Sequence, residues 1–356
     1  MFSIREADHN DNNDLIKLTR HCPMNGKISL LIDRYPDFFE LPAERGNSIT
    51  LVATSQSNNQ VIGSFTVVFF PGFVNGKEER ILYMADLKVH PEFRKQKMAL
   101  ELLKSMERHV QKFEPGIVIC LLAGGNKEVF RFLKTESAFP DFFPFGKFHV
   151  LEIFPTSKKS KRANNEIQKV EEEFMFNELI NFYNEIHKAY ELAPVVEIKA
   201  LQNCHSYVIM QDLKIVAAIS LIDPISYKQN IVLNMPLYLK FVTAALRIVK
   251  PLFRLASIPK VSQPIRTLFF RAYGYVKNEE KNFESLISFA RRFAYEKGYH
   301  FLSVGLYEKD PRMKLFDRIP KIRFLSHLLI ADFKNSDNRV KKMIEHGIPY
   351  MDFSLV

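Results

Sequence analysis

Residues 87–103, LKVHPEFRKQKMALELL, combine charge and spacing in a way that favours anion binding. A β-like run leads into a short basic loop, and an apolar stripe with helical spacing follows. The start of a helix has unpaired backbone N–H groups and a partial positive charge from the helix dipole. Arg94, Lys95 and Lys97 add full positive charges beside it. The pattern therefore predicts a diphosphate site at the backbone amides of residues 96–99.

The same residues resemble the acyl-CoA site of GNAT acetyltransferases. In that family a strand ending in L-x-V continues into P-E-[YF]-R-x-x-G-x-[GA] and then into a helix with paired leucines. This chain has LKVHPEFRKQKMA at 87–99, with two leucines at 102–103. YMADL at 83–87 is similar to the Y-L-E-D-L approach of polyamine-type members. The full string between a strand and a helix is far more specific than any fragment of it.

The resemblance implies that acetyl-CoA, or another acyl-CoA, is the co-substrate. Its pantetheine arm would pair with the backbone of Leu87 and Val89 like an added strand. The acyl group would lie where this strand separates from IVICLL at 117–122. The expected cofactor-binding residues are Leu87, Lys88, Val89, Arg94, Lys95, Gln96, Lys97, Met98, Ala99, Asn126 and Phe132. No metal is expected at the site.

Two residues depart from the family pattern. Lys97 occupies the position of the central loop glycine, and it adds a Cβ and a long side chain where backbone must approach phosphate closely. Its ammonium group could compensate by contacting the phosphate directly. Leu133 stands where many members have a tyrosine that protonates the leaving thiolate. A CoA thiol has a low enough pKa to leave with a proton from water, so activity is still expected.

Transfer to an amine requires a neutral nucleophile and a route for its proton. Asp86 matches the acidic strand position of the family and is the expected base, with an ion pair to Lys88 as the structural alternative. Tyr83 is the second candidate, either as a catalytic acid or as a wall of the acceptor pocket. Strand alternation places Asp86, Lys88 and His90 on one face, and Tyr83, Ala85, Leu87 and Val89 on the other. In tandem relatives that transfer myristoyl groups the carboxylate that ends the chain is the base, which is a less favoured alternative here.

The elements that must position these residues follow from the pattern over residues 1–155, whose order also matches the family. Strands are expected at 2–7, 48–55, 61–70, 80–89, 117–122 and 148–154, and helices at 14–22, around 28–39, at 97–113 and from 126. Residues 156–168 are polar and lysine-rich, and they are expected to form a linker.

The second half of the chain repeats the first. At a shift of 184 residues the helix at 97–113 and the strand at 117–122 align without a gap with the helix around 286 and the strand at 301–306. The predicted fold is therefore α/β, with two tandem GNAT-like units that each have a mixed sheet flanked by helices. The first unit is expected at 1–155 and a degenerate second unit at 169–356.

The second unit is not expected to bind CoA. Its loop has NEEKNF at 278–283, without a glycine and with two glutamates where phosphate would lie, and Asn282 is expected to cap the next helix. A basic amphipathic segment is inserted at about 226–260, where Lys240, Arg247 and Arg254 recur every seven residues. Packing on its own domain or on a partner subunit is favoured, and contact with a membrane surface or the acceptor is the alternative.

The composition restricts the class of protein. The 356 residues are 47% apolar and have a net charge of +10, which favours polyanionic ligands, although nucleic acid is not an expected partner. Three dispersed cysteines argue against a disulfide framework, and no apolar run long enough to span a membrane is free of charge. We therefore expect a cytoplasmic protein, a monomer or a homodimer, with peripheral membrane contact still open.

The predicted function is transfer of an acetyl group from acetyl-CoA to an amine acceptor by direct attack on the thioester. Two alternatives stay open. Lys97 and Leu133 favour a CoA-binding regulator without turnover, and the net charge favours a protein that interacts with membranes or nucleic acid.

Overall fold

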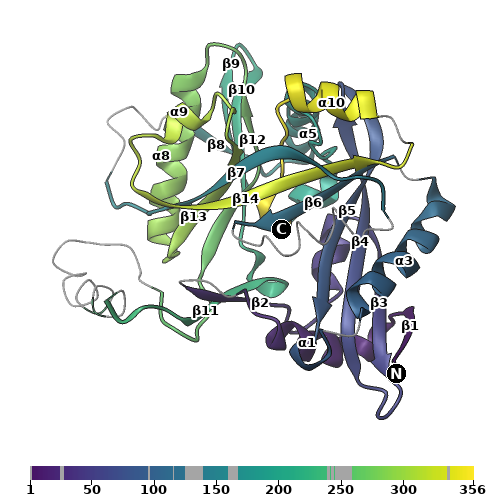
Figure 1. Ribbon diagram of the computed structural model, residues 1–356. Helices are drawn as coiled ribbons and strands as arrows, with labels where there is room; N and C mark the ends of the chain where they lie inside the picture. Colours follow the sequence, from purple (N-terminus) through teal and green to yellow (C-terminus); the bar gives the residue numbers. More distant parts are fainter. Residues whose placement is uncertain are drawn as a thin grey trace.

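The computed structural model describes residues 2–24, 28–94, 97–114, 116–124, 139–158, 167–238, 241, 244, 259–334 and 337–356. A 12-stranded mixed sheet runs through the molecule in the order β1-β3-β4-β5-β6-β14-β7-β13-β12-β10-β9-β8 (Figure 1). Its strands are β1 (Phe2–Glu6), β3 (Asn47–Ser55), β4 (Val61–Val74), β5 (Lys77–Val89), β6 (Ile117–Ala123), β7 (Phe143–Ile153), β8 (Ile167–Lys169), β9 (His205–Gln211), β10 (Lys214–Ile222), β12 (Thr267–Tyr275), β13 (Phe301–Tyr307) and β14 (Lys321–Asp332). A separate ribbon pairs β2 (Ser29–Asp33) with β11 (Gln229–Asn234).

Helices flank this sheet, so the predicted mixed α/β class is confirmed. They are α1 (Asn12–His21), α2 (Glu40–Arg45), α3 (Met98–Val110), α5 (Glu173–His187), α6 (Ile198–Leu201), α8 (Glu280–Glu296), α9 (Met313–Phe316) and α10 (Asp337–His346). Within the described ranges, none of the helices is both long and apolar enough to cross a membrane.

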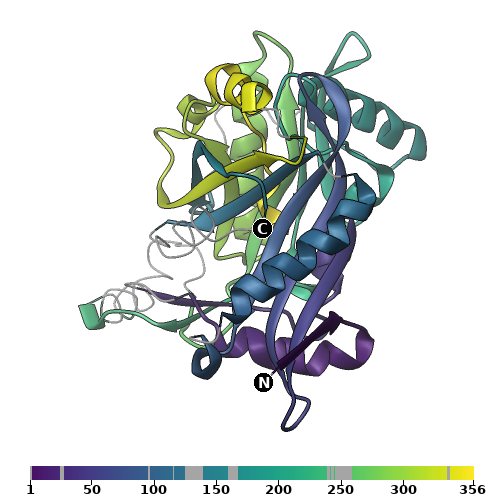
Figure 2. The same ribbon diagram turned by 45° about the vertical axis from the view of Figure 1, so that its right-hand side comes forward.

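Helices α3 and α8 occupy corresponding places in the two halves. In α3 the apolar stripe of Leu102, Leu103, Met106 and Val110 is fully buried against β3 to β6, and the helix lies across that face of the sheet (Figure 2). In α8 the aligned stripe is equally buried against β10, β12 and β13. Each buried apolar side chain contributes about 1.5–3 kcal/mol to stability. Burial of the same stripe in both halves supports the repeat inferred from the sequence.

The two halves exchange their last long strands. β7, which precedes the expected linker, pairs with β13 of the second half, whereas β14 of the second half pairs with β6 of the first. β7 and β14 are themselves antiparallel neighbours and cross the middle of the molecule side by side (Figure 1). The two predicted sheets are therefore joined into one. The division of the chain at residues 156–168 stays a prediction.

The repeat is offset slightly at the strands that precede α3 and α8. In the parallel pair of β5 and β6, Leu82 lies opposite Val118, and in the parallel pair of β12 and β13, Leu268 lies opposite Leu302. β6 and β13 thus keep the shift of 184 residues, while β5 and β12 are displaced from it by two.

The predicted helix around 28–39 is wrong. Residues 29–33 form β2, which pairs over five positions with β11 of the second half. Pro36 lacks the N–H that a helix through this stretch would need, and the pairing with β11 could not be read from local periodicity. β11 also places residues 229–234 of the expected insertion in a strand, whereas Lys240, Arg247 and Arg254 lie outside the described residues.

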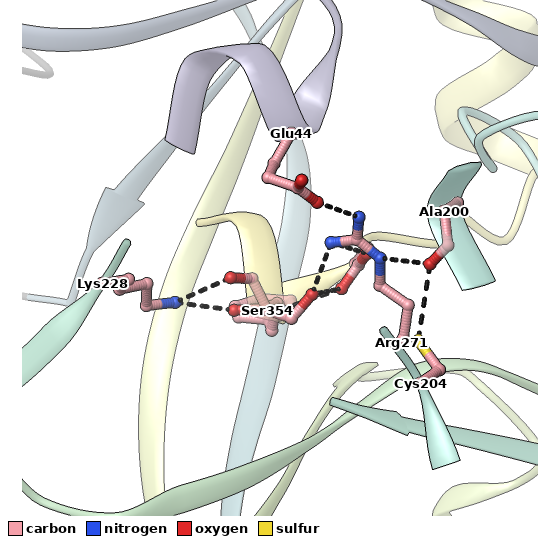
Figure 3. Close-up of polar contacts among 8 residues, drawn as sticks. Glu44, Ala200, Cys204, Lys228, Arg271 and Ser354 are labelled. Carbon is pink, nitrogen blue, oxygen red and sulfur yellow. Dashed lines mark hydrogen bonds and ion pairs between the residues drawn. The ribbon is translucent and has the colours of Figure 1, made fainter. Parts of the chain in front are cut away.

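Residues 352–356 lie at the centre of the molecule between the halves (Figure 1). Figure 3 shows Arg271 of β12, which donates to Ser354 Oγ at 3.0 Å and to Glu44 Oε2 of α2 at 3.2 Å. The neighbouring Phe353 packs directly on Gly305 of β13, where an added Cβ would lie 1.9 Å from a ring carbon. Gly305 therefore leaves the space that lets this segment sit against the sheet.

We predict that Gly305→Ala lowers the free energy of unfolding by about 1–3 kcal/mol, because Phe353 must move to accommodate the methyl group. Denaturant unfolding followed by circular dichroism measures the change. Gly116→Ala is the matched control, because a Cβ there meets only the Arg80 carbonyl oxygen at 4.0 Å. Equal stability of the two variants would contradict the packing of Phe353 on Gly305.

Candidate functional site

β5 and β6 pair over only three positions and then separate. Their parallel ladder ends at Met84–Cys120. Beyond that point β6 continues beside β14, and β5 continues beside β4 as far as Val89. The separation expected from the sequence is confirmed. On its β6 side, the strand edge at 85–89 has no ladder partner among the described strands, so it can accept an extended ligand as an added strand.

A bulge in β5 accompanies the separation. Asp86 has a φ of +49°, and the register with β4 shifts between Ser64 and Thr66. The Ser64 hydroxyl donates to the Asp86 carbonyl oxygen at 3.0 Å and stabilises the distorted backbone. Aspartate tolerates this left-handed conformation better than most residues do, because its short polar side chain can form hydrogen bonds locally.

The bulge reverses the alternation of side chains. Tyr83 and Ala85 pack on the face that meets β7, β14 and α10, whereas Leu87 and Val89 pack on the α3 face. The prediction that these four residues share one face is therefore wrong, because strict alternation assumes a regular strand.

Asp86 forms buried ion pairs with two cations. Arg34 Nη2 lies 3.2 Å from each carboxylate oxygen, and Lys88 Nζ pairs with Oδ1. Burial alone would raise the pKa of Asp86, but Arg34 and Lys88 outweigh it and hold that pKa well below its usual range. The carboxylate is therefore ionised at neutral pH. A carboxylate with so low a pKa is a weak proton acceptor.

Tyr83 lies under the guanidinium of Arg45, which is 4.0 Å from the centre of the ring. Burial raises the pKa of Tyr83 to about 12, although Arg45 opposes the shift, so the phenol keeps its proton at neutral pH. Arg45 and Tyr83 line a cavity of about 40 Å³ together with Asp352 and Val356, among others. The accessible lining of this cavity is almost entirely apolar.

Three cations here were missed by the sequence analysis, namely the buried Arg34 and Lys228 and the half-buried Arg45. Arg34 follows β2 and Lys228 precedes β11, and the pairing of Asp33 with Gln229 brings them opposite each other. Lys228 Nζ donates to the Phe353 carbonyl oxygen at 2.9 Å (Figure 3). Burial, then Arg34 and Arg45, lower the pKa of Lys228 to about 7. No local motif marks these residues, because only the pairing of β2 with β11 brings two of them together.

The start of α3 has the geometry of an anion site. Lys97, just before the helix, has a φ of +54°, the left-handed conformation that glycine adopts readily. The backbone N–H of Glu101 donates to the Lys97 carbonyl oxygen at 3.1 Å. Glu101 is thus the first N–H donor within the helix, so the N–H groups of residues 98–100 have no acceptor within it. Lys97 and Arg94 are both exposed beside them.

The structure places the remaining predicted residues as follows. Met98 is fully buried and Ala99 is half-buried. Arg94 Nε donates to the Val89 carbonyl oxygen at 3.4 Å, which is one of the groups expected to meet the pantetheine arm. Lys95, Gln96, Asn126, Phe132 and Leu133 lie outside the described residues.

The corresponding region of the second half is occupied by the chain itself. β12 and β13 pair over three positions, ending at Phe269–Ser303. Beyond them the Tyr273 hydroxyl donates to the Gly305 carbonyl oxygen at 3.3 Å, and Phe353 covers Gly305. Helix α8 begins at Glu280, and its N-cap is Glu279. The predicted cap at Asn282 is wrong, because its amide instead donates to Glu279 Oε2 at 2.6 Å.

We predict that Lys97→Gly raises the free energy of unfolding by about 1 kcal/mol, because glycine removes the strain of a left-handed residue. Lys97→Ala removes the same charge but keeps the strain, so it should give no such increase. Thermal and denaturant unfolding of the three proteins provide the measurement. A stabilised alanine variant would show that charge, and not backbone conformation, is responsible.

We also predict that Asp86→Asn costs about 3–5 kcal/mol at pH 7, because Arg34 and Lys88 lose their buried counter-charge. The folded-state pKa of Asp86 is lowered, so this stabilisation is present above its unfolded pKa of about 4 and is lost as the pH falls below it. The difference between wild type and variant should thus be about 1 kcal/mol smaller at pH 3 than at pH 7.

Urea unfolding at both pH values measures the effect. Asp14→Asn is the surface control, since Asp14 pairs with Lys17 on exposed α1. A difference between wild type and Asp86→Asn that stays constant with pH would contradict the ion pairing of Asp86.

Comparison with solved structures identifies the fold. N-myristoyltransferase from Saccharomyces cerevisiae, with bound myristoyl-CoA, is similar with a TM-score of 0.63 and 11% identity, over 93% of this chain and 82% of that chain. A GCN5-related N-acetyltransferase from Anabaena variabilis gives 0.55 and 13%, and a probable N-acyltransferase from Enterococcus faecalis gives 0.51 and 8%, each over 93% of this chain and 72% of the other.

No protein-family model and no curated protein matches the sequence. The likeness in structure nevertheless confirms the predicted fold. The chain has the fold of these N-myristoyl- and N-acetyltransferases.

Proposed function

We propose that this chain is an acyl-CoA-dependent N-acyltransferase that uses acetyl-CoA as donor and an amine as acceptor. One observation supports the proposal above the others. The unpaired β5 edge at 85–89 leads directly, through a basic loop, to the free amides at the start of α3. An extended ligand that ends in a diphosphate, as acyl-CoA does, matches both features.

In this proposal the diphosphate binds the amides of Met98 and Ala99 and the side chains of Arg94 and Lys97. The left-handed conformation of Lys97 supports this role, because it preserves the backbone path that glycine provides in the family. The pantetheine arm runs along residues 87–89 and replaces Arg94 at the Val89 carbonyl oxygen. The acyl group then enters the opening between β5 and β6.

The reaction proposed is direct transfer. The amine nitrogen attacks the thioester carbonyl carbon, the new C–N bond forms, and the C–S bond breaks. The amine proton passes to water, and the CoA thiolate leaves and takes up a proton. Asp86 and Tyr83 remain the proposed catalytic residues. The ionised Asp86 stabilises the positive charge on the attacking nitrogen, and the protonated Tyr83 is a hydrogen-bond donor.

The test is a thermal-shift titration with acetyl-CoA, followed by a measurement of CoA release with a panel of amines. At one hundred times the dissociation constant the ligand should stabilise the protein by about 2.7 kcal/mol. Arg94→Glu should lose most of this stabilisation, because it places a negative charge beside the diphosphate.

Arg108→Glu is the matched control, since Arg108 is exposed near the other end of α3. It should keep the full acetyl-CoA shift relative to its own ligand-free form. No shift with acetyl-CoA or with myristoyl-CoA would overturn the proposal. A shift without product from any amine would support the CoA-binding regulator instead.

A further inference from the structure

We propose that the acceptor amine carries a carboxylate, and that this carboxylate binds between Arg34 and Arg45 at the centre of the molecule. The inference rests on the proposed N-acyltransferase function and names the class of its acceptor.

The guanidinium of Arg34 is buried, and some of its N–H donors have no hydrogen-bond acceptor among the described residues. Its side chain is 6% exposed, and its Nη2 serves Asp86. Its Nε and Nη1 have no hydrogen-bond partner among the described residues. Buried donors without partners are costly, and such groups are rare in folded proteins. An anionic ligand would satisfy them.

Arg45 provides the second cation, and Asp86 and Asp352 act on it only from beyond ion-pair distance. No ion pair to Arg45 occurs in the part of the chain that the structure describes, and its guanidinium rests on the Tyr83 ring. Asp352 lines the same cavity, but it lies 3.4 Å from Arg271 and accepts a hydrogen bond from Ser354 at 2.6 Å. The nearby carboxylate is therefore already engaged.

The surrounding charge is positive as a whole. Lys228 lies opposite Arg34 across the β2–β11 ribbon, and it donates to the carbonyl oxygens of Phe353 and Ser354. Among the described residues, Asp86 is the carboxylate that pairs directly with Arg34 and Lys88, while Asp352 and Glu152 act on Lys228. A buried excess of positive charge favours an anion and repels a polyamine.

The same positive charge would favour attack by the acceptor amine. An amine beside several cations has a lowered pKa, which increases the fraction of neutral nucleophile at neutral pH. Burial, and after it Arg34 and Arg45, lower the pKa of the Lys228 amine in the same place. Because Asp86 is a weak proton acceptor, lowering the pKa of the acceptor amine replaces the need for a stronger base.

The position also fits the proposed reaction. Arg45 contacts Tyr83, the β5 residue just before the ladder ends, and Arg34 contacts Asp86, in the bulge just after it. A carboxylate held by the two arginines would thus be anchored on both sides of the point where β5 leaves β6. Arg45 and Tyr83 also line the cavity of about 40 Å³, whereas Arg34 is not among its lining residues.

The test compares ligands that differ only in this group. N-acetylglycine, N-acetylalanine, N-acetylserine and N-acetylphenylalanine, each with its neutral carboxamide, are titrated calorimetrically into the full chain saturated with CoA. At least one acid should bind about tenfold or more tightly than its amide, because charge-assisted hydrogen bonds are the stronger ones. Arg34→Gln and Arg45→Gln should each abolish this preference.

Arg292→Gln is the matched control and should keep the preference, because Arg292 pairs with Glu296 on the surface of α8. Arg45→Gln breaks no ion pair among the described residues, so we expect it to fold. It therefore tests the carboxylate site even if Arg34→Gln does not fold. An aminoalkyl phosphate forms a further arm. Tighter binding of the phosphate than of every acid would overturn the assignment to a carboxylate.

The proposal is also overturned if no acid binds better than its amide, or if the preference survives Arg45→Gln. Its failure can be told apart from failure of the proposed function. Stabilisation by acetyl-CoA with no preference for acids removes only the carboxylate site, whereas absence of any stabilisation by acyl-CoA removes the N-acyltransferase function itself.

Discussion

The buried ion pair between Asp86 and Arg34 connects the parts of the molecule on which the candidate site depends. Asp86 sits in the bulge that separates β5 from β6, and Arg34 follows the ribbon strand that pairs with the second half. An unpaired charge at either place would cost several kcal/mol, so the bulge and the ribbon stabilise each other. The opening in the first half thus depends on contacts with the second half.

The two halves use one architecture in different ways. In the first, the strands separate beside free helix amides and two exposed cations. In the second, Tyr273 and Phe353 fill the corresponding space, and Glu279 stands at the N-cap position of α8. The exchange of β7 and β14 makes the sheets of the two halves one sheet. Residues 352–356 lie between the two halves. The second half therefore contributes residues 352–356 and the amine of Lys228 to the surroundings of the proposed site.

The sequence predicted what local patterns encode, namely α3, the strands around it and the burial of the repeated apolar stripe, while the acyl-CoA site stays a prediction. It could not predict the reversal of side chains beyond Asp86, because a bulge leaves no periodic signal. It placed a helix where β2 pairs with a strand almost two hundred residues away. Arg34 and Lys228 were missed for the same reason, since their neighbourhood exists only through that pairing.

The most direct test of the account follows the backbone amide signals of the isotope-labelled chain by NMR while CoA is added. We expect the largest shifts at residues 98–100, whose amides would donate to the diphosphate, and at residues 87–89, where the pantetheine arm would form hydrogen bonds. Shifts concentrated at the start of α8, or no shifts at saturating CoA, would contradict it.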